Sequence, residues 1–218
     1  MNGKANLYNR QITTPVIYLF SILLLIAIAG ASLYTQLPAE RFTKDIASIA
    51  GLHPTSGILS SLGVLTWCIT ASICFFAALF LHKMRRYPEY SLLFNTGLLT
   101  SYLTLDDAFL IHERLAPDIL RIDEKVVYAI LLVFILFYLK SFWLTILRTR
   151  YSLFIASLIL LGSSLILDVL PWPEELLGGW QYLLEDGLKW LGIVSWCIYF
   201  VKTSFDYMVD CASNADSL

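Results

Sequence analysis

The hydrophobic residues of this chain gather into long runs that are rarely interrupted by charge. A helix that crosses the hydrocarbon core of a bilayer needs about 20 mostly apolar residues. Six runs come close to that length or exceed it: about Pro15–Tyr34, Ile58–Leu81, Ser91–Leu110, Val126–Ile146, Leu153–Leu170 and Trp180–Val201. The pattern therefore predicts an all-α polytopic integral membrane protein, built as a bundle of six transmembrane helices.

These runs occupy most of the 218 residues and leave no room for a separate soluble domain. We therefore expect one membrane-embedded helical domain over residues 1–218. The first run is longer than the roughly 7–15 apolar residues of a secretory signal, so it is expected to be retained as a helix. Most of the prolines fall between the runs, where helices are expected to end.

Composition supports lipid as the solvent for most of the surface. The chain is 58% hydrophobic, carries 15% charged residues and has a mean hydropathy of +0.70. Soluble domains average about 25% charged residues. The formal net charge of −2 gives no support to nucleic-acid binding. Membrane lipids are the expected partners, and protein partners, a homo-oligomer among them, are left open.

The positions of lysine and arginine predict the orientation, because cytoplasmic loops retain positive charge. With both termini inside, the inner segments carry Lys4, Arg10, Lys83, Arg85, Arg86, Arg148, Arg150 and Lys202. The outer loops then carry Arg41, Lys44, Arg114, Arg121 and Lys125. We therefore predict a protein of the plasma membrane, the bacterial inner membrane, with both termini in the cytoplasm.

Charged residues enter the predicted membrane region at one level. At 1.5 Å per residue, Asp106 lies about 22 Å along its helix, in the outer third of the bilayer. The expected outer ends of three helices together carry Asp106, Asp107, His112, Glu113, Asp168, Glu185, Asp186 and Lys189. The loop that contains Glu174 and Glu175 belongs to the same side. Unpaired charges in hydrocarbon cost several kcal/mol, so we expect a shared polar chamber that opens to the outside.

Helical geometry predicts which of these side chains meet. Asp106 and Glu113 are seven residues apart, so on a straight helix they share a face within about 20°. Asp107 lies about 100° to one side and could join that pair, whereas His112 lies about 120° to the other side, toward a neighbouring helix or the loop. The natural pair on this helix is therefore Asp106 with Glu113.

One interpretation of the cluster is a metal site. Its ligands would be Asp106, Asp107, His112, Glu113, Glu185 and Asp186. Carboxylates with an imidazole suit zinc, iron or manganese, and helical bundles hold such ions between facing helices. The spacing weakens this interpretation, because Asp107 and His112 are five residues apart and diverge. His53 is the second imidazole available on the outer side.

The leading interpretation is a small membrane-embedded enzyme, with or without a metal, that acts on a lipid or lipid-linked substrate. Its acids and bases would be Asp106, Asp107, Glu185, Asp186 and Lys189. Positioned carboxylates can serve as general acid and base, and Glu185 and Lys189, one helical turn apart, can pair. A proton- or cation-coupled transporter could use the same acids. A structural or accessory subunit, whose charges only pair internally, is the third alternative.

Overall fold

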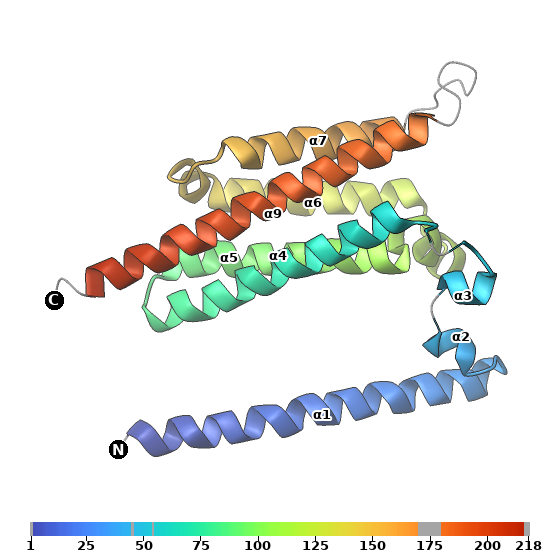
Figure 1. Ribbon diagram of the computed structural model, residues 1–218, viewed down its shortest axis with the longest axis horizontal. Helices are drawn as coiled ribbons and strands as arrows, with labels where there is room; N and C mark the ends of the chain where they lie inside the picture. Colours follow the sequence, from blue (N-terminus) through green and yellow to red (C-terminus); the bar gives the residue numbers. More distant parts are fainter. Residues whose placement is uncertain (1, 45, 54, 170–179, 216–218) are drawn as a thin grey trace. The chain divides into compact units, whose positions relative to one another are not determined.

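The computed structural model describes residues 2–44, 46–53, 55–169 and 180–215. The elements are α1 (Asn2–Thr35), α2 (Glu40–Thr43), α3 (Ile46–Ala50), α4 (Ile58–Lys83), α5 (Tyr87–Phe109), the π-helix η1 (Ile111–Leu120), α6 (Glu124–Leu147), α7 (Ser152–Val169) and α9 (Trp180–Ala215) (Figure 1). Within these ranges every regular element is a helix and no strand occurs. The predicted all-α class is confirmed.

The chain divides into two compact units, Met1–Ser56 and Gly57–Leu218. The first contains α1 and the two short helices α2 and α3. In α2, the Lys44 ammonium pairs with the Glu40 carboxylate one turn earlier, at 2.6 Å. The second unit contains all of the remaining helices. The expectation of a single domain over the whole chain stays a prediction.

Local sequence signals fix where the helices of the second unit begin. Pro88 stands in the first turn of α5, where its missing N–H removes no helical hydrogen bond. The side chain of Asp123 accepts a hydrogen bond from the backbone N–H of Lys125 at 2.8 Å and caps α6. These starts place Asp106 near the C-terminal end of α5 and Tyr128 near the N-terminal end of α6, on the same side of the second unit.

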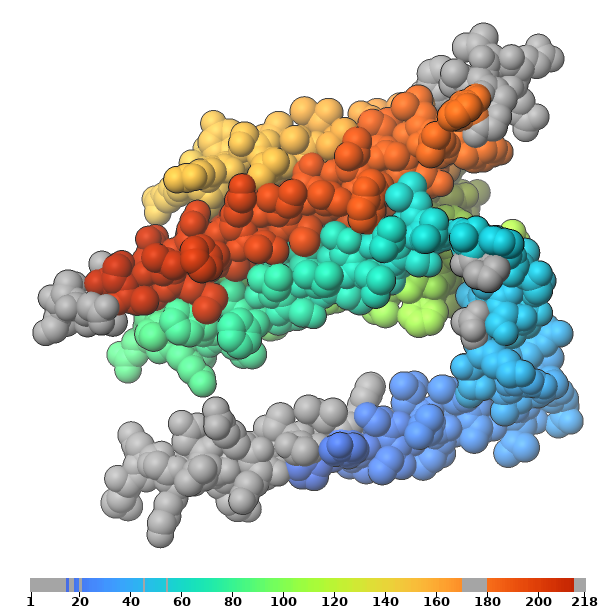
Figure 2. All heavy atoms as spheres, in the orientation of Figure 1, coloured from blue at the N-terminus to red at the C-terminus, as the bar shows by residue number. Residues whose placement is uncertain are grey.

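The core of the second unit lies between α4, α5, α7 and α9. Helix α9 packs along both α4 and α7, and α4 packs along α5; the side chains of α4 and α9 meet on the face seen in Figure 2. Aromatic rings fill the centre: Trp196 lies 5.5 Å from Phe154 and 4.8 Å from Phe200 between ring centroids. Such large side chains bury much apolar area at favourable ring geometries, so they tie α7 to α9.

Helix α6 is attached more loosely. Its nearest neighbours are η1 and α5, and only 11% of its most apolar stretch is buried, against 39% in α4. The hydroxyl groups of Tyr138 on α6 and Thr96 on α5 form a hydrogen bond of 2.6 Å. Most side chains of α6 are therefore exposed or line the cavities beside it.

Three of the described helices, α4, α6 and α7, are long and apolar enough to cross a membrane. Six spans were expected, and the shortfall has a physical reason in two helices. Helix α5 carries Asp106 and Asp107, and α9 carries Glu185, Asp186 and Lys189. The charges of the expected chamber therefore lower the hydropathy of the helices that hold them. In α1, only Ser21–Thr35 qualifies, as a shorter apolar helix.

Gly192 permits the close packing of α9 on α7. A Cβ at this position would lie 2.7 Å from the Leu161 Cγ and 3.1 Å from its backbone nitrogen. We expect Gly192→Ala to lower the free energy of unfolding by about 1–3 kcal/mol, because the helices must separate. Gly187→Ala is the control, since a Cβ there meets nothing within 4 Å. Thermal unfolding in detergent should show a lower melting temperature for Gly192→Ala but not for Gly187→Ala. An equal decrease in both variants would contradict this packing.

Candidate functional site

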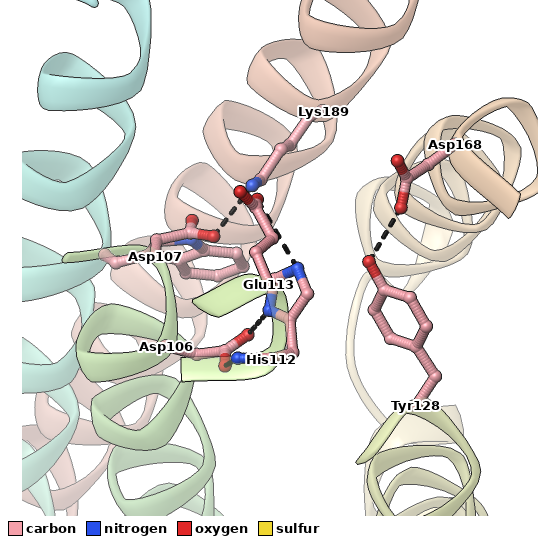
Figure 3. A network of polar contacts seen from close by, with 8 residues as sticks. Asp106, Asp107, His112, Glu113, Tyr128, Asp168 and Lys189 are labelled. Atoms are coloured by element: carbon pink, nitrogen blue, oxygen red, sulfur yellow. Dashed lines mark hydrogen bonds and ion pairs between the residues drawn. The ribbon is translucent and has the colours of Figure 1, made fainter. Parts of the chain in front are cut away.

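The end of α5 folds His112 back over Asp106. Leu110 has a left-handed backbone conformation, with φ of 49°, and the π-helix η1 starts directly after it. The backbone N–H of His112 donates to Asp106 Oδ1 at 3.1 Å, and its ring Nδ1 lies 2.6 Å from Asp106 Oδ2 (Figure 3). Both residues are buried. The result is a compact aspartate–histidine pair.

This geometry determines which nitrogen of His112 can accept a proton. A carboxylate only accepts hydrogen bonds, so Nδ1 carries the hydrogen and Nε2 has the free lone pair when the ring is neutral. Burial alone would lower the pKa of His112, but the hydrogen bond and charge of Asp106 outweigh it and raise the pKa above its ordinary value of 6.5. Nε2 lies 3.6 Å from Oε1 of the half-exposed Glu113.

The predicted pairing of Asp106 with Glu113 is wrong, because His112 pairs with Asp106 instead. His112 also faces a neighbouring helix, as expected, through its ring contact with Tyr128 on α6. The predicted pairing assumed a straight α-helix through residue 113. The break at Leu110 and the π-helical turn change the angle per residue, since a π-helix closes its hydrogen bonds five residues apart rather than four. His112 therefore takes the place beside Asp106 that Glu113 would have had.

Asp107 joins three helices. Its Oδ1 accepts from the Lys189 ammonium of α9 at 2.7 Å, and its Oδ2 accepts from the Trp67 indole N–H of α4 at 2.9 Å. The spacing within α9 allowed Lys189 to pair with Glu185, and internal pairing of the charges was an alternative; in the structure the ion pair of Lys189 is with Asp107. A contact across helices satisfies the largely buried Asp107 carboxylate, whereas pairing within α9 would have left it without a cation.

A third polar contact links α6 to α7. The Tyr128 hydroxyl donates to Asp168 Oδ2 at 2.7 Å (Figure 3), and the Tyr128 ring centroid lies 4.9 Å from that of His112. Neither Tyr128 nor Trp67 was among the predicted site residues. Each is an aromatic residue with one polar atom inside an apolar helix, and such atoms usually find a partner when buried. This single polar atom within an apolar helix was the sequence signal that could have identified both residues.

A cavity of about 300 Å³ lies between α5, α6, α7 and α9. One end is lined by the polar residues Asp106, Asp107, His112, Glu113, Tyr128, Asp168, Glu185 and Lys189. Further along the same helices the lining is apolar and includes Leu103, Leu131, Ile135, Phe154, Leu158 and Trp196. The cavity therefore has a charged end and an apolar end, as a site for an amphipathic molecule requires.

The structure brings together most of the residues predicted for the site. Asp186 does not line this cavity; it lines a small pocket of about 30 Å³ between α4 and α9, which it shares with Asp107 and Lys189. Its neighbour Glu185 faces the larger cavity. Glu174 and Glu175 of the adjoining loop lie outside the described residues.

The predicted ligands of a zinc, iron or manganese ion are arranged differently. Within residues 2–44, 46–53, 55–169 and 180–215, no three His, Cys, Asp or Glu side chains are grouped so that they could hold a metal ion. The oxygens of Asp106 and Asp107 accept from N–H groups of the protein instead. In the first unit, Nδ1 of His53 lies 2.8 Å from the Thr55 hydroxyl.

Comparison with other proteins places the chain in a family. No curated protein and no solved structure matches it. Residues 16–203 match a family model described as a domain of unknown function, DUF8692. That match covers nearly all of both the apolar helices and the polar site. The chain therefore belongs to the DUF8692 family.

Proposed function

We propose that this protein is a membrane-embedded enzyme that hydrolyses a lipid or lipid-linked substrate, with His112 as its general base. The proposal includes six membrane spans, a site near the outer face and both termini in the cytoplasm. Three apolar helices and the excess of positive charge in the proposed inner segments support this arrangement. Helices α5 and α9 would cross the membrane with Asp106, Asp107, Glu185 and Lys189 directed into the cavity rather than into lipid.

The observation that carries the proposal is the buried pair of Asp106 and His112 on the wall of a cavity. The carboxylate fixes the ring and its tautomer, which leaves Nε2 as the atom that removes a proton. Water would give one proton to Nε2 while its oxygen attacks a carbonyl or phosphoryl group. The proton on Nε2 would then pass to the leaving group as its bond to the substrate breaks, and so the imidazole is regenerated.

One further side chain suits the charge that develops on the attacked oxygen. The Lys189 ammonium lines the polar end of the cavity and has N–H groups beyond the one that it donates to Asp107; a donor there stabilises an oxyanion more strongly than it would in water. The apolar end favours a lipid substrate over a proton or cation pathway, because such a pathway needs polar groups along its whole length.

The dependence of rate on pH tests the proposal. Protein in lipid nanodiscs is incubated with glycerophospholipids, ceramides and polyprenyl phosphates, and products are measured by mass spectrometry. His112 must be neutral to accept a proton, so kcat/KM should rise with pH, with a midpoint above 6.5 because Asp106 raises the pKa of His112. Asp106→Asn removes that charge and should move the midpoint to lower pH while lowering the maximum rate.

Asp206→Asn is the matched control, because Asp206 is exposed on α9 and does not line this cavity. Its pH profile should coincide with that of the wild type. Absence of turnover across the panel at every pH would contradict the proposal. So would a midpoint that Asp106→Asn leaves unchanged.

A further inference from the structure

From the charges and shape of the cavity we infer that its ligand is an amphiphile with a positively charged amine headgroup and a long aliphatic chain. The inference rests on the proposed function only in naming this ligand as the substrate class. The binding itself depends on the cavity and not on catalysis, and can therefore be tested separately.

The polar end of the cavity has more negative than positive groups. Among the described residues, five carboxylates line it, those of Asp106, Asp107, Glu113, Asp168 and Glu185, and Lys189 is the one lysine or arginine. With His112 neutral, five negative charges and one positive charge give −4 for this lining. The headgroup region is therefore strongly electronegative.

The one lysine and the histidine already have partners. Lys189 pairs with Asp107, and His112 contacts Asp106 through both its ring and its backbone. Three carboxylates remain. Glu113 approaches His112 at 3.6 Å, and Asp168 accepts a hydrogen bond from an uncharged phenol. Glu185 forms no hydrogen bond or ion pair with the side chains that the structure describes.

The apolar walls of the cavity have a low dielectric constant, which strengthens the attraction or repulsion between this excess negative charge and a charged ligand. Clefts lined by charges of one sign concentrate molecules of the opposite charge. A phosphate or carboxylate headgroup would add negative charge beside Glu113, Asp168 and Glu185, whereas an ammonium group could donate hydrogen bonds to them. The electrostatics therefore favour a cationic headgroup over an anionic one.

The rest of the cavity selects for an aliphatic chain. Its apolar end offers side chains such as Leu103, Ile135 and Leu158 and no charged group. A second apolar cavity of about 430 Å³ lies between α5 and α6 and shares Leu99, Leu131 and Tyr138 with the first. The shared residues make the two spaces adjacent, so a chain too long for the first cavity can continue beside α6.

Three probes with the same 18-carbon chain isolate the headgroup: oleylamine, oleyl alcohol and oleic acid, which are positively charged, neutral and negatively charged at pH 7. Their dissociation constants are measured on the full-length protein in a non-ionic detergent by native mass spectrometry. We expect oleylamine to bind about tenfold more tightly than oleyl alcohol, a difference of about 1.4 kcal/mol, and oleic acid to bind more weakly than both.

Variants locate the binding. Glu113→Gln and Glu185→Gln should each weaken oleylamine binding about three- to tenfold and leave oleyl alcohol unchanged. Leu158→Trp should weaken both probes, because its larger ring fills the apolar end. Asp206→Asn is the charge control and should change neither. Equal affinity for amine and alcohol, or an amine preference that survives both glutamine variants, would overturn the inference.

His112→Ala separates this inference from the proposed function. The variant should retain the amine preference, because the inference assigns the headgroup to the carboxylates and not to the imidazole. If oleylamine binds as expected but no amine-bearing lipid is turned over, the proposed function fails and the ligand class stands. If only lipids without an amine are hydrolysed, and the protein binds oleylamine no more tightly than oleyl alcohol, the proposed function stands and this inference fails.

Discussion

Replacing His112 by alanine should lower turnover by about 10²- to 10⁴-fold, the usual contribution of a positioned general base. The variant loses the only imidazole among the residues that line the described cavity. It also leaves the buried Asp106 carboxylate without the ring hydrogen bond, so the melting temperature must be measured beside the rate. A folded variant with a rate near that of the wild type would exclude His112 as the base.

His82→Ala provides the histidine control. This residue lies in the last turn of α4, at the opposite end of the second unit from the cavity's polar residues, and packs against Tyr90 with ring centroids 4.9 Å apart. Its removal should leave kcat unchanged. His112→Gln is a second test, because its amide can still bond Asp106 but cannot take up a proton. Recovery of stability without recovery of rate would assign His112 to proton transfer rather than to folding.

Replacing Asp107 by leucine should destabilise the fold by about 2–3 kcal/mol. Removal of one partner from a buried ion pair costs about 3–5 kcal/mol, and we reduce that range because the Lys189 side chain is 38% exposed and can regain some solvent. The Trp67 indole would lose its acceptor as well. Unfolding in mixed micelles with increasing denaturing detergent measures the change.

The double variant Asp107→Leu/Lys189→Met identifies the cause. It removes both charges and leaves no unpaired ammonium, so it should recover most of the stability lost in Asp107→Leu. Lys189→Met alone should be destabilising, because it leaves Asp107 with only the indole donor. If the double variant is as unstable as the sum of the two single variants, the pair is not what joins α5 to α9.

The sequence was sufficient for the long helices and for most of the acids that line one cavity. Long apolar runs require helices in either lipid or a core, and acids such as Asp106 and Glu185 are too costly to stand alone among them. The depth of these acids in a membrane stays a prediction. Hydropathy also identified α4, α6 and α7 as membrane-compatible, because those helices contain few charges.

The pairing within the site could not be predicted in the same way. It depends on one backbone torsion at Leu110, and leucine rarely adopts a left-handed conformation, so no local signal marked the break. The partner of Lys189 depended on the packing of α9 against α5, which the spacing within α9 does not contain. The donors Trp67 and Tyr128 were hidden for a related reason, since hydropathy treats an aromatic ring by its apolar area and not by its single polar atom.

The loose attachment of α6 has a consequence for how a lipid would reach His112. Where α6 meets α5 and α7, the Tyr138–Thr96 and Tyr128–Asp168 hydrogen bonds hold it beside open space rather than against an interlocked apolar surface. An amphiphile dissolved in a membrane leaflet would enter laterally, between α5 and α6, without passing through bulk water. Its rate of encounter with the cavity would then depend on its mole fraction in the membrane. Low solubility in water would not limit that rate.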